Sequence, residues 1–277
     1  MLDFMKVDEL IYATLAEDTP FGDITTEYTV PDDSVSKARL VAKQDGVLAG
    51  MDIFKRVFEI LNDDINVEIF FNDGAFVEKG TVIAHLEGPT KEMLIGERTG
   101  LNILQRLSGI ATATSQYVKL TEGYKVKIAD TRKTTPGLRY FEKYAVRMGG
   151  GSNHRFSLSD GVMIKDNHIV AAGGIKNAVE AVRKHIPHTV KVEVETENLD
   201  MVREAVEAGA DIIMLDNMSD EMMAEAVKII DGKALTEASG DMNEARIKSV
   251  AATGVDIISI GRLTHSVKSM DISLKFY

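Results

Sequence analysis

The second half of the chain alternates short β-branched runs with stretches in which hydrophobic residues recur every three or four positions. Residues 174–186 and 197–208 have this helical period, and helices are expected to stop at Pro187 and before Gly209. Ser219 precedes a third such stretch and has the side chain of an N-cap. The β-branched runs begin near residues 126, 162, 191, 211, 234 and 256. Strands that alternate with helices in this way predict βα units on a parallel sheet.

The number of these units predicts an α/β fold built on an incomplete TIM-like barrel. A complete barrel has eight units over about 250 residues, whereas only six runs lie between residues 126 and 264. Each run ends in polar residues or glycine, which is where barrel enzymes carry their catalytic groups. An open, doubly wound sheet is the alternative. The lack of a Gly-x-Gly-x-x-Gly motif after the first run disfavours it.

The first part of the chain has a different pattern, which predicts a separate α+β sandwich domain. Its helical periods and strand-like runs are interspersed, and a long helix is expected to follow from Lys91. The expected helices lie around 7–15 and 52–61, and the expected strands near 38–43, 67–71 and 82–86.

The end of the chain is expected to return to the sandwich domain, because residues 271–276 form one more strand-like run. The predicted domains are therefore an amino-terminal sandwich of residues 1–106, joined by 266–277, and a barrel of residues 107–265.

Composition narrows the classes of function. The chain has 277 residues, of which 44% are hydrophobic and 27% charged, as in globular proteins. It contains no cysteine, which excludes disulfides, thiolate metal sites and a cysteine nucleophile. The first residues carry acids and no long apolar run, so we expect a cytoplasmic protein without a membrane span. A net charge of −11 disfavours binding to nucleic acid.

Positive charge is nevertheless concentrated in one segment. Residues 125–165 contain nine lysines or arginines and only three acids. A cationic segment in an acidic protein predicts a small anionic ligand.

Several side chains at the predicted strand ends could bind such a ligand. Arg132, Arg155 and Lys165 are expected on adjacent strand ends, where arginine can pair with a carboxylate or phosphate through two hydrogen bonds. His154 alone would be read as structural, but its place beside these cations favours binding. Arg106, on the long helix, is interpreted as a surface residue.

Two acids at the end of one strand require partners. Glu193 and Glu195 are two residues apart, so they point to the same side of the strand. Buried carboxylates need cations, a metal or a solvated barrel mouth. The alternative to a functional role is a structural ion-pair network with Lys165 or Lys133.

Glycines at two later strand ends suggest a phosphate site. Ser239-Gly240 and Gly261 offer backbone N–H groups, where barrels of this type commonly bind phosphate. Together with the cations and acids, this pattern fits a phosphorylated sugar and an organic acid, with the acids binding Mg²⁺ or sugar hydroxyls.

Eight ordered blocks resemble the quinolinate phosphoribosyltransferase family. They cover nearly the whole chain and are ERTGLNILQRLSGIATAT, IADTRKTTPGLR, KYAVRMGGGSNHR, LSDGVMIKDNHI, VEVE, IMLDNM, EASG and DISL. The resemblance implies an α/β sandwich on an incomplete α/β barrel. It also implies a glycosyltransferase that moves the phosphoribosyl group of phosphoribosyl pyrophosphate to quinolinate, giving nicotinate mononucleotide, pyrophosphate and CO₂ in de novo NAD biosynthesis.

The resemblance further implies a homodimer, in which Arg98 reaches the neighbouring subunit's site. Quinolinate would be bound by Arg132, His154, Arg155 and Lys165, with Thr131 also in the substrate-binding set. Phosphoribosyl pyrophosphate and its Mg²⁺ would contact Lys133, Lys165, Glu195 and Asp216, the predicted catalytic residues. Glu195 and Asp216 would hold the metal directly or indirectly, and Ser239, Gly240, Asp241, Gly261 and Arg262 would surround the 5-phosphate.

Two residues depart from the family pattern. Asp241 stands where glycine commonly follows Ser-Gly, and Arg262 stands where a small residue commonly follows Gly261. We hypothesise that they pair across neighbouring strand ends, so that Arg262 offsets the repulsion between Asp241 and phosphate.

Other readings remain open at this point. A Schiff-base aldolase could use Lys133 or Lys165 as its nucleophile, and an anion-binding sensor or storage protein would bind without turnover. Nicotinate is the nearest alternative substrate. The segment 17–26 is also similar to a molybdenum-associated paralogue group, although the residues 165–168 and 97–99 favour the quinolinate branch.

Overall fold

The computed structural model describes residues 2–277, which divide into two compact units. The first unit takes in the residues up to Ala113 together with Tyr140–Gly150 and Val267–Tyr277. The second takes in Thr114–Arg139 and Gly151–Ser266.

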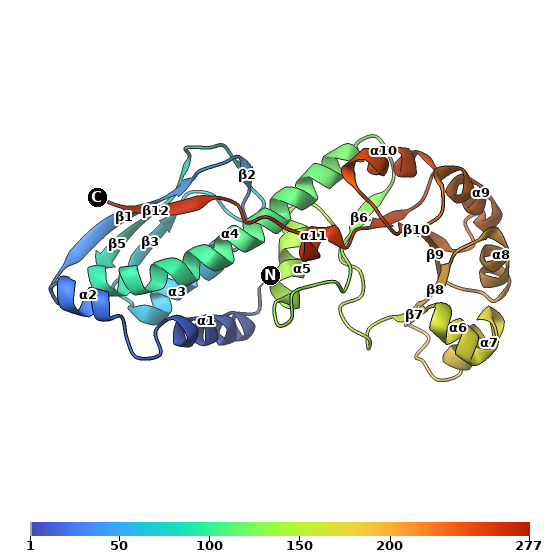
Figure 1. The fold of residues 1–277 in the computed structure, drawn as a ribbon, viewed down its shortest axis with the longest axis horizontal. Coiled ribbons are helices and arrows are strands. Elements are labelled where there is room, and N and C mark those ends of the chain that lie inside the picture. The colour runs from blue at the N-terminus through green and yellow to red at the C-terminus, as the bar shows by residue number, and fades with distance from the viewer. Residues whose placement is uncertain (1) are drawn as a thin grey trace. The chain divides into compact units, whose positions relative to one another are not determined.

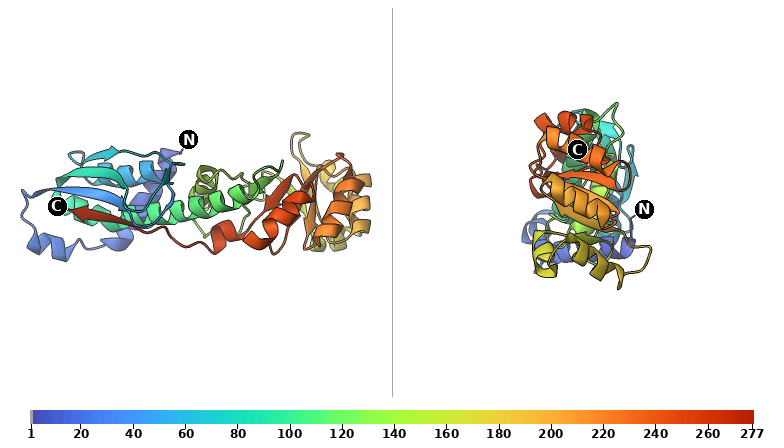
Figure 2. Two further views of the ribbon diagram at one scale, coloured as in Figure 1. Left: turned by 90° about the horizontal axis from the view of Figure 1, so that it is seen from above. Right: turned by 90° about the vertical axis from the view of Figure 1, so that its right-hand side faces the viewer.

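The first unit contains a four-stranded antiparallel sheet in the order β12-β1-β5-β3. These strands are β1 (Val35–Ala42), β3 (Asn66–Ile69), β5 (Val82–Pro89) and β12 (Ile272–Phe276), and β2 (Gly46–Val47) pairs with β4 (Phe76–Val77). Figures 1 and 2 show β12 (red) beside β1 (blue). The expected return of the chain's end to this sheet is confirmed.

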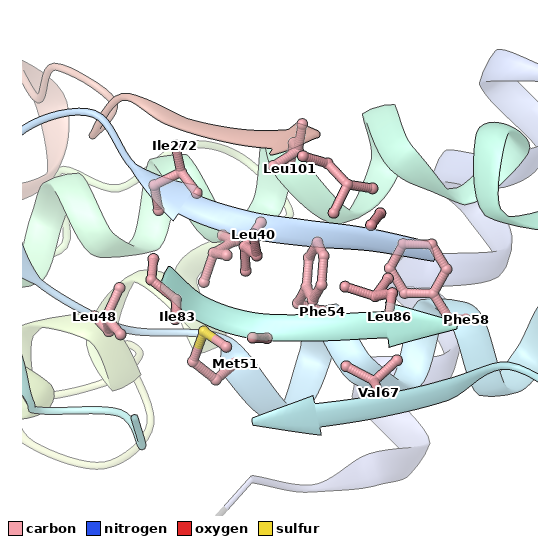
Figure 3. Packing of buried hydrophobic residues seen from close by; sticks show 14 of the residues in the cluster. Leu40, Leu48, Met51, Phe54, Phe58, Val67, Ile83, Leu86, Leu101 and Ile272 are labelled. Atoms are coloured by element: carbon pink, nitrogen blue, oxygen red, sulfur yellow. The ribbon is translucent and has the colours of Figure 1, made fainter. Parts of the chain in front are cut away.

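Helices α3 (Met51–Leu61) and α4 (Thr90–Leu120) share a hydrophobic core with this sheet. The other helices of this part of the chain are α1 (Phe4–Asp18), α2 (Ile24–Thr29) and α5 (Arg139–Met148). In Figure 3, Phe54 and Phe58 of α3 lie among Leu40 and Leu86 of the sheet. All four side chains are buried, as the helical and strand periods in this part of the chain require.

Arg106 is not the free surface residue that we expected. Its Nε donates to Oε1 of Glu142 at 3.0 Å, and the Glu142 side chain is fully buried. The two residues are 36 positions apart, so no local pattern connects them. Arg106 therefore helps to compensate a buried charge.

This pair predicts a measurable loss of stability. Arg106→Met deprives the buried Glu142 of a guanidinium, and we expect the free energy of unfolding to fall by about 2–4 kcal/mol. Arg203→Met is the control, because Arg203 pairs with Asp200 in solvent, where such a pair contributes about 0–1 kcal/mol. Urea unfolding measures both changes. Equal losses of unfolding free energy in Arg106→Met and Arg203→Met would show that the buried pair contributes no more stability than the exposed pair.

The second unit is a parallel sheet of six strands in the order β6-β11-β10-β9-β8-β7. Its strands are β6 (Lys127–Ala129), β7 (Val162–Ile164), β8 (Val192–Thr196), β9 (Ile212–Asp216), β10 (Leu235–Ser239) and β11 (Ile257–Ser259). The edges β6 and β7 do not pair with each other, so the sheet stays open between them. The predicted incomplete barrel is confirmed.

Helices follow the strands as the sequence indicated. They are α6 (Asp166–Ala172), α7 (Ile175–Arg183), α8 (Leu199–Glu207), α9 (Asp220–Ile230), α10 (Glu244–Ala252) and α11 (Arg262–His265). Figure 1 shows α8, α9 and α10 on the outer side of the strands. Ser219 caps α9 by accepting a hydrogen bond from the Met222 N–H at 3.2 Å, as expected. This arrangement directs the carboxyl ends of the strands toward one common rim.

Candidate active site

A cavity of about 720 Å³ lies at this rim, within the second unit. Its volume is in the range of small-molecule sites. Thirteen of the fourteen predicted site residues line it: Thr131, Arg132, Lys133, His154, Arg155, Lys165, Glu195, Asp216, Ser239, Gly240, Asp241, Gly261 and Arg262. The fourteenth, Arg98, lies on α4 in the first unit. The structure thus brings together cations, acids and glycines from segments more than a hundred residues apart.

Seven other lining residues were missed by the sequence reasoning: Met163, Met214, Asn217, Glu237, Met242, Ser259 and His265. Four of them have a simple signal. Met163, Met214, Glu237 and Ser259 each lie two positions before a predicted site residue, and the side-chain period of a strand is two. Each lies on a strand, one side-chain period before Lys165, Asp216, Ser239 or Gly261.

Lys165 and Glu195 form an ion pair at the ends of neighbouring strands. The distance from Lys165 Nζ to Glu195 Oε2 is 2.7 Å, and the side chains are 44% and 13% exposed. This contact is the network that we considered as the structural alternative. Because both residues line the cavity, the pair also places one positive and one negative group beside any ligand there.

Asp216 lies near Glu195, and the two carboxylates repel each other. Burial and the neighbouring Glu195 raise the pKa of Asp216, whereas Lys165 acts in the opposite direction. Asn217 Nδ2 donates to Asp216 Oδ2 at 2.7 Å. Oxygen ligands of this kind suit Mg²⁺, and a cation between the carboxylates would relieve their repulsion. The residues present therefore fit a magnesium ion.

Two arginines of the lining, Arg132 and Arg155, supply positive charge. Burial and the nearby Arg132 lower the pKa of Arg155. The Nη1 of Arg155 is held by the Gly161 carbonyl at 2.9 Å. In contrast, the buried Nε of Arg132 donates no hydrogen bond within residues 2–277. A buried donor of this kind calls for an acceptor, and an anionic ligand would provide one.

His154 lies between two buried acids. Its Nε2 is 3.1 Å from Glu193 Oε2 and 3.4 Å from Glu237 Oε1, and the acids are 4% and 1% exposed. Burial lowers the pKa of His154, but these carboxylates outweigh burial and raise it to about 10. The Arg155 backbone nitrogen lies 2.7 Å from Nδ1, and Nε2 carries the N–H that faces the two acids. The three groups are close enough to hold a metal ion, but His154 pairs with both acids and cannot bind a metal while its Nε2 carries a proton.

The segment that carries His154 is fixed by Asp130, another residue that the sequence reasoning missed. Asp130 is fully buried at the end of β6. Its carboxylate accepts hydrogen bonds from the Asn153 side chain at 2.6 Å and from the His154 N–H at 2.8 Å. The three glycines before Asn153 therefore lead into a loop that a buried acid holds in place.

The raised pKa of His154 predicts a dependence of stability on pH. A folded pKa of about 10, above the ordinary 6.5, means that protonated His154 stabilises the fold fully below pH 6.5. This stabilisation is lost as the pH rises through about 10. We therefore expect His154→Asn to be destabilised relative to the parent protein at pH 6 and much less so near pH 10. Urea unfolding at both pH values tests this, and a pH-independent gap between the two proteins would contradict it.

The glycine strand ends face the same cavity, but one predicted contact is absent. Within the described chain, residues 2–277, no ion pair joins Asp241 and Arg262, and both side chains are exposed. Asp241 has a φ of 42°, so its backbone is in the left-handed region, and this local conformation sets the direction of its side chain. Our pairing hypothesis for these two residues was wrong.

Comparisons with known proteins agree with this site. Residues 23–108 match the model of the quinolinate phosphoribosyl transferase N-terminal domain, and residues 110–275 match that of the C-terminal domain. The chain belongs to the quinolinate phosphoribosyltransferase family. The resemblance seen in the sequence blocks is confirmed.

Relatives of this family match over almost their whole length. A probable nicotinate-nucleotide pyrophosphorylase (carboxylating) of Bacillus subtilis is 45% identical over 99% of this chain and 94% of its own. One from Methanocaldococcus jannaschii is 44% identical over 96% and 95%. The crystal structure of NadC from Streptococcus pyogenes has a TM-score of 0.96 at 42% identity and covers 100% of this chain and 99% of its own.

Arg98, the remaining predicted site residue, belongs to the first unit. It is exposed on α4 and makes no hydrogen bond or ion pair within residues 2–277. Burial raises the pKa of the neighbouring Glu97, and the positive charge of Arg98 only partly opposes this shift.

In the described residues 2–277, no helix combines the length and the apolar character that crossing a bilayer requires.

Proposed function

We propose that this protein transfers the phosphoribosyl group of phosphoribosyl pyrophosphate to quinolinate, with loss of CO₂, in de novo NAD biosynthesis. One observation carries the proposal: a single cavity combines arginines for carboxylates, glycine strand ends for a phosphate and a carboxylate pair for Mg²⁺. The family supports it, since the matched relatives are named for this reaction.

The quinolinate end of the site is the cationic part. We assign the two ring carboxylates to Arg132, Arg155 and Lys165, because guanidinium groups bind carboxylates through paired hydrogen bonds. The unused Nε of Arg132 supports this assignment. His154 and Thr131 complete this side of the cavity.

The phosphoribosyl end lies at the later strands. We assign the 5-phosphate to the backbone N–H groups of Ser239, Gly240 and Gly261, with Asp241 and Arg262 beside them. Glu195 and Asp216 would hold Mg²⁺, directly or through water. Bound there, Mg²⁺ would neutralise charge on the pyrophosphate as it leaves.

The reaction needs no protein nucleophile. The pyridine nitrogen donates its electron pair to C1 of the ribose, and the C1–O bond breaks with its electrons going to pyrophosphate. Glu195 and Asp216 stabilise the positive charge that develops on the sugar, and Lys133 and Lys165 stabilise the departing anion. The bond from C2 of the ring to its carboxylate then breaks. The electron pair stays on C2, next to the cationic nitrogen, until a proton takes it up, and CO₂ leaves.

The assembly and the cellular location are part of the proposal. We propose a cytoplasmic homodimer in which Arg98 reaches the partner's site. The free, exposed state of Arg98 supports this, as do large apolar side chains exposed on the first unit. Among them are Met5, Tyr12, Phe21, Ile24 and Tyr28.

A product analysis tests the proposed function. The protein is incubated with Mg²⁺, phosphoribosyl pyrophosphate and either quinolinate or nicotinate, and the nucleotide product is identified by chromatography and mass. We expect nicotinate mononucleotide from quinolinate and little product from nicotinate, which leaves one arginine without its carboxylate. Faster turnover of nicotinate, or binding without turnover, would contradict the proposal. Trapping of a lysine adduct by borohydride would indicate the aldolase.

A further inference from the structure

Asn217 lies next to both parts of the phosphoribosyl end, the carboxylate assigned to Mg²⁺ and the loop assigned to the 5-phosphate. The proposed reaction itself gives Asn217 no role. Asn217 comes directly after Asp216 at the end of β9, and its side chain lines the cavity. Its Nδ2 donates to Asp216 Oδ2 at 2.7 Å.

The backbone of Asn217 is in a conformation that few side chains accept. Its φ is 55°, and the only other non-glycine residues with positive φ in the described chain, 2–277, are Asp231 and Asp241. Asparagine tolerates this region better than most residues, because its short polar side chain finds local hydrogen bonds. Asp231 ends helix α9, away from the cavity, whereas Asn217 and Asp241 flank Gly240. Two of these three residues with an unusual backbone conformation therefore lie where a phosphate is expected to bind.

The same side chain also touches the glycine loop after β10. A Cβ added to Gly240 would lie 2.1 Å from Asn217 Oδ1 and 2.8 Å from the Asn217 nitrogen. The Asn217 N–H donates to the Ser239 carbonyl at 3.1 Å. One residue thus contacts the carboxylate assigned to Mg²⁺ and the backbone assigned to the 5-phosphate.

We propose that Asn217 is a positioning residue that fixes the Asp216 carboxylate against the Ser239-Gly240 loop, so that both are ready to receive phosphoribosyl pyrophosphate with its Mg²⁺. The inference rests on the proposed function and extends it to a residue that acts through Asp216 and Gly240. Partners of this kind, which orient a metal-binding carboxylate, typically change metal affinity or activity by about 10–100-fold when they are removed.

Two variants distinguish the effect of the Asn217 hydrogen bond to Asp216 from the effect of the Asn217 backbone conformation. Asn217→Asp keeps the shape, the tolerance of positive φ and the packing on Gly240, but it replaces the donor to Asp216 with a carboxylate that repels it. Asn217→Gly keeps the backbone without strain and removes the whole side chain. Asp231→Gly is the matched control, because it removes a left-handed side chain from the same strand-helix unit at a site remote from the cavity.

The experiment measures binding as well as turnover. Calorimetry gives the affinity for phosphoribosyl pyrophosphate with Mg²⁺ in the absence of a pyridine substrate, and separately the affinity for quinolinate. We expect both Asn217 variants to lose about 10–100-fold in affinity for phosphoribosyl pyrophosphate and to need more Mg²⁺ for half-maximal rate. Their affinity for quinolinate and their Tm should stay close to those of Asp231→Gly.

Either of two results would overturn the inference. Asn217→Asp with the parent affinity for phosphoribosyl pyrophosphate would show that Asp216 needs no amide partner. Equal losses for both substrates together with a lowered Tm would show a merely structural role. Failure of the proposed function is distinct from both, because the parent protein itself would then not bind phosphoribosyl pyrophosphate.

Discussion

We expect Lys165→Ala to lower kcat/KM with quinolinate and phosphoribosyl pyrophosphate by about 10²–10³-fold. Lys165 is the one cation of the cavity that is ion-paired to a proposed metal ligand, at 2.7 Å from Glu195. Its removal takes a positive charge from the point where both anionic substrates meet, and lost stabilisation of a developing charge has effects of this size. The Glu195 carboxylate, only 13% exposed, would also lose its partner.

Steady-state kinetics with each substrate varied in turn measures this effect. Lys176→Ala is the control, since Lys176 is 73% exposed on α7 and pairs only loosely with Glu180. Its kinetic constants should match those of the parent protein. Lys165→Arg should recover only part of the activity, because the planar guanidinium is not a substitute for an ammonium group at a fixed contact. If Lys165→Ala retained the parent kcat/KM, the assignment of the cavity as the active site would be wrong.

We expect Gly240→Ala to reduce kcat/KM for phosphoribosyl pyrophosphate by at least about 10²-fold, comparable to losing a key backbone donor. Gly240 has a φ of +87°, and an added methyl group would collide with the side chain and backbone of Asn217. The loop after β10 would have to shift, which would move the N–H groups assigned to the 5-phosphate.

Gly209→Ala separates this clash from simple backbone strain. Gly209 has a similar φ of +75°, but nothing lies within 4 Å of the added methyl group. This control should lose about 1–2 kcal/mol of stability, the cost of a left-handed alanine, while its KM for phosphoribosyl pyrophosphate stays unchanged. Equal KM values for phosphoribosyl pyrophosphate in Gly240→Ala and Gly209→Ala would show that the loop after β10 is not part of the binding site.

Much of the fold follows from local periodicity. The six parallel strands, the capped start of α9 at Ser219 and the returning strand β12 all carry their signals within about ten residues. The incomplete barrel could be predicted by counting βα units, because the chain has six of them and a closed barrel needs eight.

The site could be predicted in part for the same reason. Parallel strands bring their carboxyl ends to one rim, so residues such as Lys165 and Asp216 were placed together without knowledge of side-chain directions. The contacts that sequence reasoning missed are long-range. The pairing of Arg106 with Glu142, and of His154 with Glu237, depends on which elements pack together. The mistaken pairing of Asp241 with Arg262 failed because neighbouring strand ends do not fix where exposed side chains point.

The central claim is that one cavity joins quinolinate to phosphoribosyl pyrophosphate and then expels a particular carboxylate. Quinolinate labelled with carbon-14 in its 2-carboxylate, or alternatively in its 3-carboxylate, tests it when the release of labelled CO₂ and of pyrophosphate is followed together. We predict one labelled CO₂ per pyrophosphate from the 2-carboxylate, none from the 3-carboxylate, and none without phosphoribosyl pyrophosphate. Pyrophosphate release without CO₂, or CO₂ release that does not need phosphoribosyl pyrophosphate, would contradict the account.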